Sequence, residues 1–340
     1  MIGLRSKLGY RGFWSDSILN MKKVLFTNCS FKDSDIEKLK FQKIEIRKEK
    51  GDLSENELIA ALQDCQGYVI GGADKATRNV IEKTNLKIIN FYGTGYENYV
   101  NVKVASEKDI VVANTPKANA YTVAEHSVAL ILDAVKGTTW LNNSTKKGGW
   151  NRRITWNLQG KTLGVIGMGT IGSHVATILH NGFGMNVIYT SRSQKNQVEK
   201  EMGAKKVSLE DLFSESDVIT IHSAYNEKLV NKIGKEQFSV MKKHAVLVNA
   251  ARAELVDPVS LKESLENNVF ATAAFDAYYK EPAPELESDE WRLLSLPDRK
   301  FIITPHTAYG SKEAFENMNN MVIENLTNFF EGKDVPYKVN

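Results

Sequence analysis

A glycine-rich turn between a strand and a helix is the feature that most constrains this fold. Residues 161–166 (KTLGVI) predict an apolar strand, residues 173–180 a helix, and residues 185–190 a second strand. The first turn has the GxGxxG spacing, with glycines at Gly167, Gly169 and Gly172. In this context the first glycine permits a tight turn, the second lets backbone amides approach a pyrophosphate, and the third allows close helix–strand packing. The unit therefore predicts a dinucleotide-binding Rossmann domain.

Two series of alternating strand and helix patterns surround this turn. The first runs from residue 22 to about residue 115, and the second from residue 161 to residue 303. A long apolar-faced helix is predicted between them, at 120–136, and a last helix follows at 312–331. Such alternation is typical of βαβ crossovers around a parallel sheet. The sequence thus predicts an α/β protein with two doubly wound parallel-sheet domains.

Charge balance, hydropathy and cysteine content exclude several classes of partner and cofactor from what we expect. The 44 basic and 41 acidic residues of this 340-residue chain nearly balance, and no dense basic cluster is interleaved with aromatics. Nucleic acid is therefore not an expected partner. No uninterrupted apolar run reaches the roughly 18–20 residues of a membrane span, so no membrane partner is expected. Cys29 and Cys65 lack CxxC or Cys/His spacing, which predicts no disulfide, no metal site and a cytoplasmic location.

Residues 1–20 are interpreted as an N-terminal extension before the fold. They lack a continuous hydrophobic stretch of the signal-peptide type, although they are basic until Asp16. Met21 directly precedes KKVLFT, a predicted strand, so it is either the true start or a junction with added sequence. A weak organelle-targeting interpretation stays open.

The end of the strand at 185–190 indicates which dinucleotide is used. An NAD enzyme normally places an acidic residue there to bind the ribose 2′-OH, but this chain has Ser191-Arg192-Ser193 after Thr190. An arginine flanked by hydroxyls can pair with a 2′-phosphate, whereas an acidic group would repel it. We therefore expect NADP, with NAD as the alternative, in which case Arg192 is a solvated surface charge.

Three ionisable residues follow predicted strands of the second series and suit the reduction of a keto acid. The planar fork of Arg252 can hold a carboxylate and polarise the neighbouring carbonyl. Hydride transfer leaves an alkoxide that needs a proton, a role that suits His306, and a carboxylate such as Glu281 could orient the ring. Taken singly, Arg252 could be a salt-bridge partner, Glu281 a loop charge and His306 a capped turn histidine.

Several ordered motifs together make the chain resemble the D-isomer-specific 2-hydroxyacid dehydrogenase family. The resemblance extends from about Met21 to the C-terminal helix. Besides the glycine turn, it rests on Gly93-Thr94-Gly95-Tyr96-Glu97-Asn98, Asn114-Thr115-Pro116, Thr122-Val123-Ala124-Glu125-His126, Asn249-Ala250-Ala251-Arg252, Asp276, Glu281-Pro282 and Thr304-Pro305-His306. The Thr190-Ser191-Arg192 stretch is similar to that of NADP-using glyoxylate/hydroxypyruvate reductases.

The resemblance implies a role for each matching residue. Arg252, Glu281 and His306 match the catalytic arginine, glutamate and histidine, and the amides of Thr94 and Gly95 match the loop that binds the substrate carboxylate. The implied cofactor contacts are Gly167, Gly169, Thr170, Ile171, Gly172, Ser191, Arg192, Ser193, His222, Ala250, Asp276 and His306.

The resemblance also implies a domain arrangement and an assembly. Residues 21–119 and 309–340 would form a flavodoxin-like substrate domain. A Rossmann NAD(P)-binding domain, residues 120–308, would be inserted between the two parts. Homodimerisation through the cofactor domain is implied as well.

We therefore expect reduction of a small 2-keto acid to the D-2-hydroxy acid. The alternative is a nucleotide-sensing corepressor-like binding protein of the same fold. A formate-type enzyme is disfavoured, because Glu281 stands where such an enzyme would have glutamine. His126 and His174 are interpreted as packing or surface histidines. The acidic insertion 282–298 either covers the active site or is a solvated loop.

Overall fold

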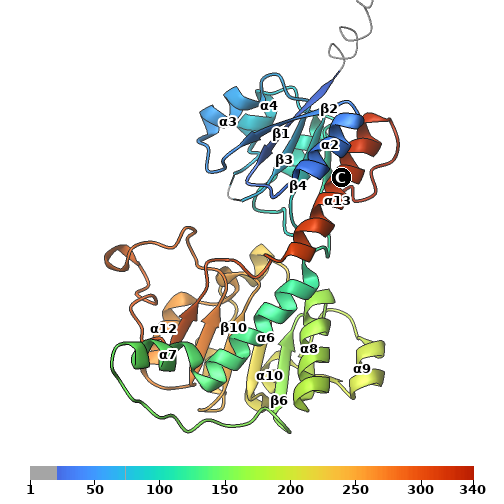
Figure 1. The fold of residues 1–340 in the computed structure, drawn as a ribbon. Helices are drawn as coiled ribbons and strands as arrows, with labels where there is room; N and C mark the ends of the chain where they lie inside the picture. The colour runs from blue at the N-terminus through green and yellow to red at the C-terminus, as the bar shows by residue number, and fades with distance from the viewer. Residues whose placement is uncertain (1–20, 73) are drawn as a thin grey trace, which may run out of the picture. The chain divides into compact units, whose positions relative to one another are not determined.

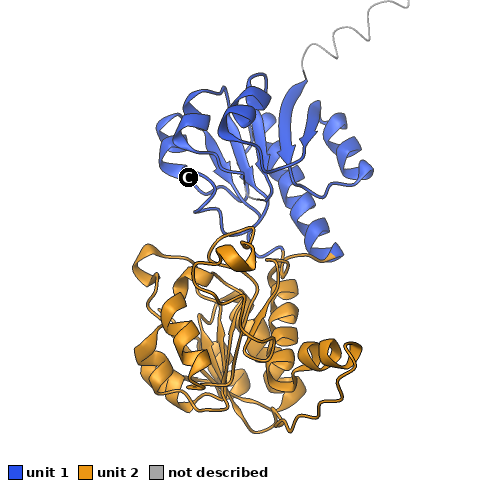
Figure 2. Cartoon of the chain, turned by 90° about the vertical axis from the view of Figure 1, so that its left-hand side faces the viewer, with its two compact units in different colours: residues 1–118, 312–340 blue, residues 119–311 orange. Residues whose placement is uncertain are grey.

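The structure is a computed structural model that describes residues 21–72 and 74–340. It forms two compact units (Figures 1 and 2). The first comprises the described residues up to Ala118 together with Lys312–Asn340, and the second is Asn119–Ser311. The expected extension, residues 1–20, lies outside the described residues.

The first unit is built on a sheet of five parallel strands in the order β2-β1-β3-β4-β5. This is the doubly wound order of flavodoxin-like sheets, and β3 and β4 are buried along their whole length. The strands are β1 (Lys22–Thr27), β2 (Ile44–Glu49), β3 (Gly67–Ile70), β4 (Ile88–Phe91) and β5 (Val111–Ala113). The helices are α2 (Asp33–Phe41), α3 (Glu55–Leu62), α4 (Arg78–Glu82), α5 (Val102–Glu107) and α13 (Lys312–Phe330).

The last helix belongs to this first unit although it is remote from it in sequence. On α13, Met318, Val322 and Leu326 recur at helical spacing and are fully buried. They share a core with Val24 and Phe26 of β1. Burial of this apolar face against the sheet therefore returns the chain to its first unit, as the colouring of Figure 2 shows.

The second unit contains a sheet of seven parallel strands in the order β12-β11-β10-β9-β6-β7-β8. From β6 the chain winds first to β7 and β8 and then back to β9, so the order reverses between β6 and β9. Ligands bind at such reversals, outside the carboxyl ends of the strands. The strands are β6 (Thr162–Ile166), β7 (Asn186–Thr190), β8 (Lys205–Lys206), β9 (Val218–Ile221), β10 (Val246–Asn249), β11 (Thr272–Phe275) and β12 (Phe301–Ile303).

Helix α6 forms much of the core on one face of this second sheet. Its residues Ala124, Val128, Ile131 and Val135 are buried and pack with Val165 of β6. In Figure 1 the helix lies along the sheet beside α8. The helices are α6 (Ala120–Lys136), α7 (Thr138–Lys146), α8 (Thr170–Phe183), α9 (Asn196–Met202), α10 (Leu209–Glu215), α11 (Lys235–Ser239) and α12 (Pro258–Glu266).

Two doubly wound parallel sheets confirm the predicted fold class. The described residues contain no helix long and apolar enough to cross a membrane. Some helix ends differ from the expected ones: α13 ends at Phe330 rather than at residue 331, and α8 spans Thr170–Phe183 rather than 173–180.

Candidate active site

The three glycines of the turn meet three different surroundings in the second unit. Gly167 has φ +96°, and a Cβ there would lie 2.7 Å from the backbone of His222 and Ser223. A Cβ on Gly172 would lie 2.3 Å from the carbonyl oxygen of Gly167, so α8 can pack on β6 only without one. At Gly169, by contrast, a Cβ would have no neighbour within 4 Å. Two glycines therefore close the turn, and the third leaves an open face.

That open face fits a dinucleotide pyrophosphate. Gly169 is the N-cap of α8, and Gly169 and Thr170 are exposed. The first amides of a helix have no intrahelical acceptor and lie at the positive end of its dipole. Gly169, Thr170 and Ile171 would hold the phosphates through these amides.

The ribose end of the predicted site is a polar turn after β7. Ser191 donates its hydroxyl to the carbonyl of Ser193 at 2.5 Å, and the Arg192 side chain is exposed. The nearest acidic residue in sequence, Glu199, accepts hydrogen bonds from the Tyr189 hydroxyl at 2.7 Å and from the Gln194 amide at 2.9 Å. Glu199 is therefore engaged elsewhere, which leaves a cationic turn suited to a 2′-phosphate.

His306 and Glu281 form a hydrogen-bonded pair. His306 Nδ1 lies 2.9 Å from Glu281 Oε2, and the side chains are 33% and 37% exposed, respectively. His306 has φ +48°, a left-handed backbone in the loop after β12. The bond to Nδ1 leaves Nε2 as the ring nitrogen that can face a substrate. The predicted acid–base pair is thus brought together.

Asp276 fixes the loop that carries His306. Its carboxylate is 2% exposed and accepts hydrogen bonds from the Thr304 hydroxyl (2.6 Å) and from the amides of Thr307 (3.0 Å) and Ala308 (2.8 Å). Burial by itself raises the pKa of the Asp276 carboxyl. Hydrogen bonds from His126, Thr304 and the two amides outweigh burial, so its pKa lies below the ordinary value. The carboxylate is therefore ionised and is bonded to His126 of α6 and to the loop after β12.

His126 is a member of this cluster. Its Nε2 lies 3.1 Å from Thr304 Oγ1 and 3.3 Å from Asp276 Oδ1. Interpretation as a packing histidine missed these contacts, because nothing in the helix pattern of α6 indicates what its side chain meets. His174, the other such histidine, makes an edge-on contact with the Tyr121 ring.

Arg252 follows β10 in a turn that Asn249 holds. Asn249 is 1% exposed, donates its amide to the Arg252 carbonyl at 2.8 Å and accepts from the Ala251 amide at 3.0 Å. Arg252 itself is half-buried and donates to the Ala251 carbonyl at 2.9 Å. An asparagine side chain often accepts from the amide two residues later, as Asn249 does from Ala251. This Asx-turn pattern could have identified Asn249 as a positioning residue from the sequence.

His222 supports the glycine turn with its backbone. Its side chain points inward, where Nε2 lies 2.8 Å from Thr220 Oγ1 and the buried Nδ1 has no hydrogen-bond partner among the described residues. Burial lowers the pKa of His222 to about 3. The ring is therefore neutral at physiological pH.

In the first unit, the loop carrying Thr94 and Gly95 follows β4 and is held by hydrogen bonds from asparagine side chains. Asn114 donates its side-chain amide to the Thr94 carbonyl at 2.9 Å. Asn325 of α13 donates in turn to the Asn114 carbonyl at 3.2 Å and to Asn90 Oδ1 at 2.7 Å. These asparagines are buried, and sequence reasoning did not single out Asn90 or Asn325. They join the last helix to the predicted substrate loop.

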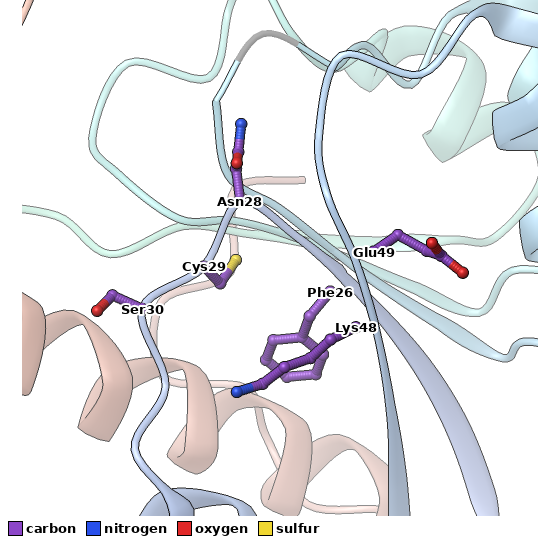
Figure 3. A pocket seen from close by; sticks show the side chains of 6 residues that line it. All are labelled: Phe26, Asn28, Cys29, Ser30, Lys48 and Glu49. Atoms are coloured by element: carbon purple, nitrogen blue, oxygen red, sulfur yellow. The ribbon is translucent and has the colours of Figure 1, made fainter.

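A cavity of about 330 Å³ in the first unit is separate from every predicted site residue (Figure 3). Two of its polar groups are already engaged, since Lys48 Nζ donates to the Phe31 carbonyl at 3.0 Å and Cys29 Sγ to the Thr27 carbonyl at 3.2 Å. It is lined by Phe26, Asn28, Cys29, Ser30, Lys48 and Glu49.

The insertion 282–298 is anchored rather than freely solvated. Asp289 is 5% exposed and accepts from the Tyr278 hydroxyl at 2.5 Å and the Leu294 amide at 2.9 Å. Leu293 is fully buried in the core of the second unit. The insertion therefore braces Tyr278, whose amide donates to Glu281 at 3.4 Å.

A pyrophosphate cradle at a Rossmann reversal, with an acid–base pair and an arginine on the same unit, is the arrangement of an NAD(P)-dependent oxidoreductase. Comparison with known sequences makes this class more specific. Residues 128–308 match the family model described as "D-isomer specific 2-hydroxyacid dehydrogenase, NAD binding domain". The chain belongs to the D-isomer specific 2-hydroxyacid dehydrogenase family, and it is an NAD(P)-dependent 2-hydroxyacid dehydrogenase.

Individual relatives agree with this assignment. A glyoxylate reductase from Korarchaeum cryptofilum is 33% identical over 306 residues, which cover 87% of this chain and 89% of the relative. A D-3-phosphoglycerate dehydrogenase from Archaeoglobus fulgidus is 35% identical over 85% of this chain, but only 54% of the relative is covered. The apo structure of D-lactate dehydrogenase from Escherichia coli superposes with a TM-score of 0.80 at 26% identity, covering 94% of this chain and 100% of that one.

Proposed function

We propose that this enzyme reduces a small 2-keto acid to the D-2-hydroxy acid, with NADPH as the preferred cofactor. The observation that carries the proposal is the 2.9 Å hydrogen bond between His306 and Glu281. When bound, the nicotinamide supplies the hydride. The chain's own residues must then orient the keto acid and provide a proton.

His306 is the proposed proton donor. With Nδ1 bound to Glu281, the ring has a fixed orientation, and the carboxylate stabilises its protonated form. His306 Nε2 then donates the proton to the carbonyl oxygen as the alcohol forms. The same ring accepts that proton in the reverse reaction.

Arg252 and the amides of Thr94 and Gly95 are the proposed carboxylate anchors. A guanidinium offers paired donors that match the two oxygens of a carboxylate. The Asn249 bonds support this role, because they set the turn before substrate binds. We propose that residues 21–119 and 309–340, which carry Thr94 and Gly95, form the substrate domain, and that residues 120–308, which carry Arg252, form the cofactor domain.

NADP preference is proposed from the turn after β7, where Arg192 replaces the acid that NAD enzymes use. The other proposed cofactor contacts are Gly167, Gly169, Thr170, Ile171, Gly172, Ser191, Ser193, His222, Ala250, Asp276 and His306. For His222, burial of the ring supports a contact through its backbone only.

We further propose that the enzyme is a cytoplasmic homodimer that associates through its cofactor unit. The connection between α7 and β6 exposes two large apolar side chains, Trp150 at 80% and Ile154 at 100%. Sedimentation of the wild type should give the mass of two chains. The double variant Trp150→Ser, Ile154→Ser should be monomeric, and an unchanged dimer would place the interface elsewhere.

The decisive test is a spectrophotometric assay of NADPH and NADH oxidation. Glyoxylate, hydroxypyruvate, pyruvate and an aromatic keto acid are the substrates to compare, since the glyoxylate reductase from K. cryptofilum suggests the smallest of them. Turnover with at least one acid is expected. Tight nucleotide binding without turnover of any of them would instead favour the corepressor-like alternative.

A further inference from the structure

We propose that His126 is a positioning residue that holds the active-site loop, and so His306, through Thr304 and Asp276. The proposal rests on the proposed function, because His306 is taken as the proton donor. His126 does not touch that pair. It lies on α6, 178 positions before Thr304 in the sequence.

The geometry defines which atom donates. Thr304 Oγ1 lies 2.6 Å from Asp276 Oδ1, and an ionised carboxylate can only accept, so the hydroxyl hydrogen points to Asp276. The hydroxyl then offers only lone pairs to His126. His126 Nε2 must therefore carry a hydrogen, which it shares between Thr304 Oγ1 at 3.1 Å and Asp276 Oδ1 at 3.3 Å.

The consequence for the loop follows from the remaining contacts of Asp276. Its carboxylate also accepts the amides of Thr307 and Ala308, which flank the C-terminal side of His306. His306 itself has a left-handed backbone, which needs support from its surroundings. One end of this network is the imidazole on α6, whose neighbours Ala124 and Val128 are buried in the core. His126 of α6 thus bonds to both Thr304 and Asp276, the two groups that hold this strained loop.

Replacement of His126 by leucine removes the donor while keeping a side chain of similar bulk. Glutamine can place an amide nitrogen near the position of Nε2, so His126→Gln should retain the bond. Glu125→Gln is the matched control, because Glu125 is the exposed preceding residue of the same helix. If His126→Leu does not fold, His126→Asn serves instead, since its shorter amide cannot reach Thr304.

Two readouts are measured on the whole enzyme. Hydrogen exchange of residues 304–308 should be faster in His126→Leu than in the wild type, with protection elsewhere in α6 retained. Turnover should fall by about 10- to 100-fold, because a small misplacement of a catalytic group costs that much, while the KM for NADPH changes little. His126→Gln should restore both, and Glu125→Gln should match the wild type.

The outcomes separate this inference from the proposed function. Unchanged exchange at 304–308 in His126→Leu would overturn the inference, whatever the activity. The same holds if kcat stays at the wild-type value, or if His126→Gln is as impaired as the leucine variant. Absence of turnover in the wild type would instead overturn the proposed function, and the exchange measurement would still decide the role of His126.

Discussion

Glu281 and His306, which are 25 positions apart on two different loops, meet through a hydrogen bond of 2.9 Å between Oε2 and Nδ1. Glu281 is in turn bonded by the amide of Tyr278, and His306 lies on the loop held by Asp276. Both partners are about one-third exposed. The pair is therefore prearranged yet accessible to a small substrate.

Removing the ring nitrogen should abolish proton donation but not nucleotide binding. In His306→Gln, kcat should fall by about 10²- to 10⁴-fold, the usual contribution of a positioned acid–base group. Glu281→Gln should cost less, because the histidine remains and only its orientation and protonated form lose support. Steady-state kinetics and a fluorescence titration with NADPH measure the two effects. Near-normal turnover of His306→Gln would refute the assigned role.

Exchange of Arg192 for aspartate should reverse the cofactor preference. A charge-assisted hydrogen bond contributes about 1.5–3 kcal/mol, so the KM for NADPH should rise by roughly 10- to 100-fold. The KM for NADH should fall, because the new carboxylate can accept from the ribose 2′-OH. Lys200→Ala, which removes an exposed charge on α9, is the control and should leave the KM for NADPH and the KM for NADH unchanged. A wild type that prefers NADH would contradict the argument directly.

The glycine turn allows a matched pair of alanine substitutions on α8. A Cβ at residue 172 would lie 2.3 Å from the Gly167 carbonyl, so Gly172→Ala must push the helix from β6. We expect its NADPH affinity to fall by about tenfold or more. Gly182 has nothing within 4 Å of its Cβ position, so Gly182→Ala should gain roughly 0.5–1 kcal/mol of stability. Equal nucleotide affinity in the two variants would argue against the close-packing role of Gly172.

His222 should make the second unit less stable in mild acid. Its pKa is lowered from 6.5 to about 3 in the folded chain, so between these values only the unfolded chain is protonated. The contribution of the neutral ring is therefore present above pH 6.5 and is lost as the pH falls toward 3. From pH 7 to pH 5 the loss attributable to His222 is about 2 kcal/mol.

The variant His222→Gln should lack this part of the acid dependence. Urea unfolding at pH 7 and pH 5 can be followed by tryptophan fluorescence, which reports mainly on the second unit, because it holds Trp140, Trp150, Trp156 and Trp291. The difference in unfolding free energy between the two pH values should be larger in the wild type by the stated amount. Parallel losses in both proteins would show that the ring titrates normally.

Local patterns determined the fold class of this chain and predicted the chemistry of its candidate site. Alternation of strand and helix predicted both sheets, and the glycine spacing predicted the cradle on Gly167, Gly169 and Gly172, because backbone sterics act within a few residues. Arg252, Glu281 and His306, together with the resemblance of the motifs around them, predicted the reduction of a keto acid.

Tertiary structure decided which groups meet. The bond between His126 and Thr304 spans 178 positions, and that between Asn325 and Asn114 spans 211. Neither can be read from periodicity, since a helix pattern tells which face is buried but not which strand end it covers. The anchoring of 282–298 through Asp289 depends on the same long-range packing. Side-chain identity is local, whereas hydrogen-bond partnership at the active-site loop is a property of the folded sheet and of α6.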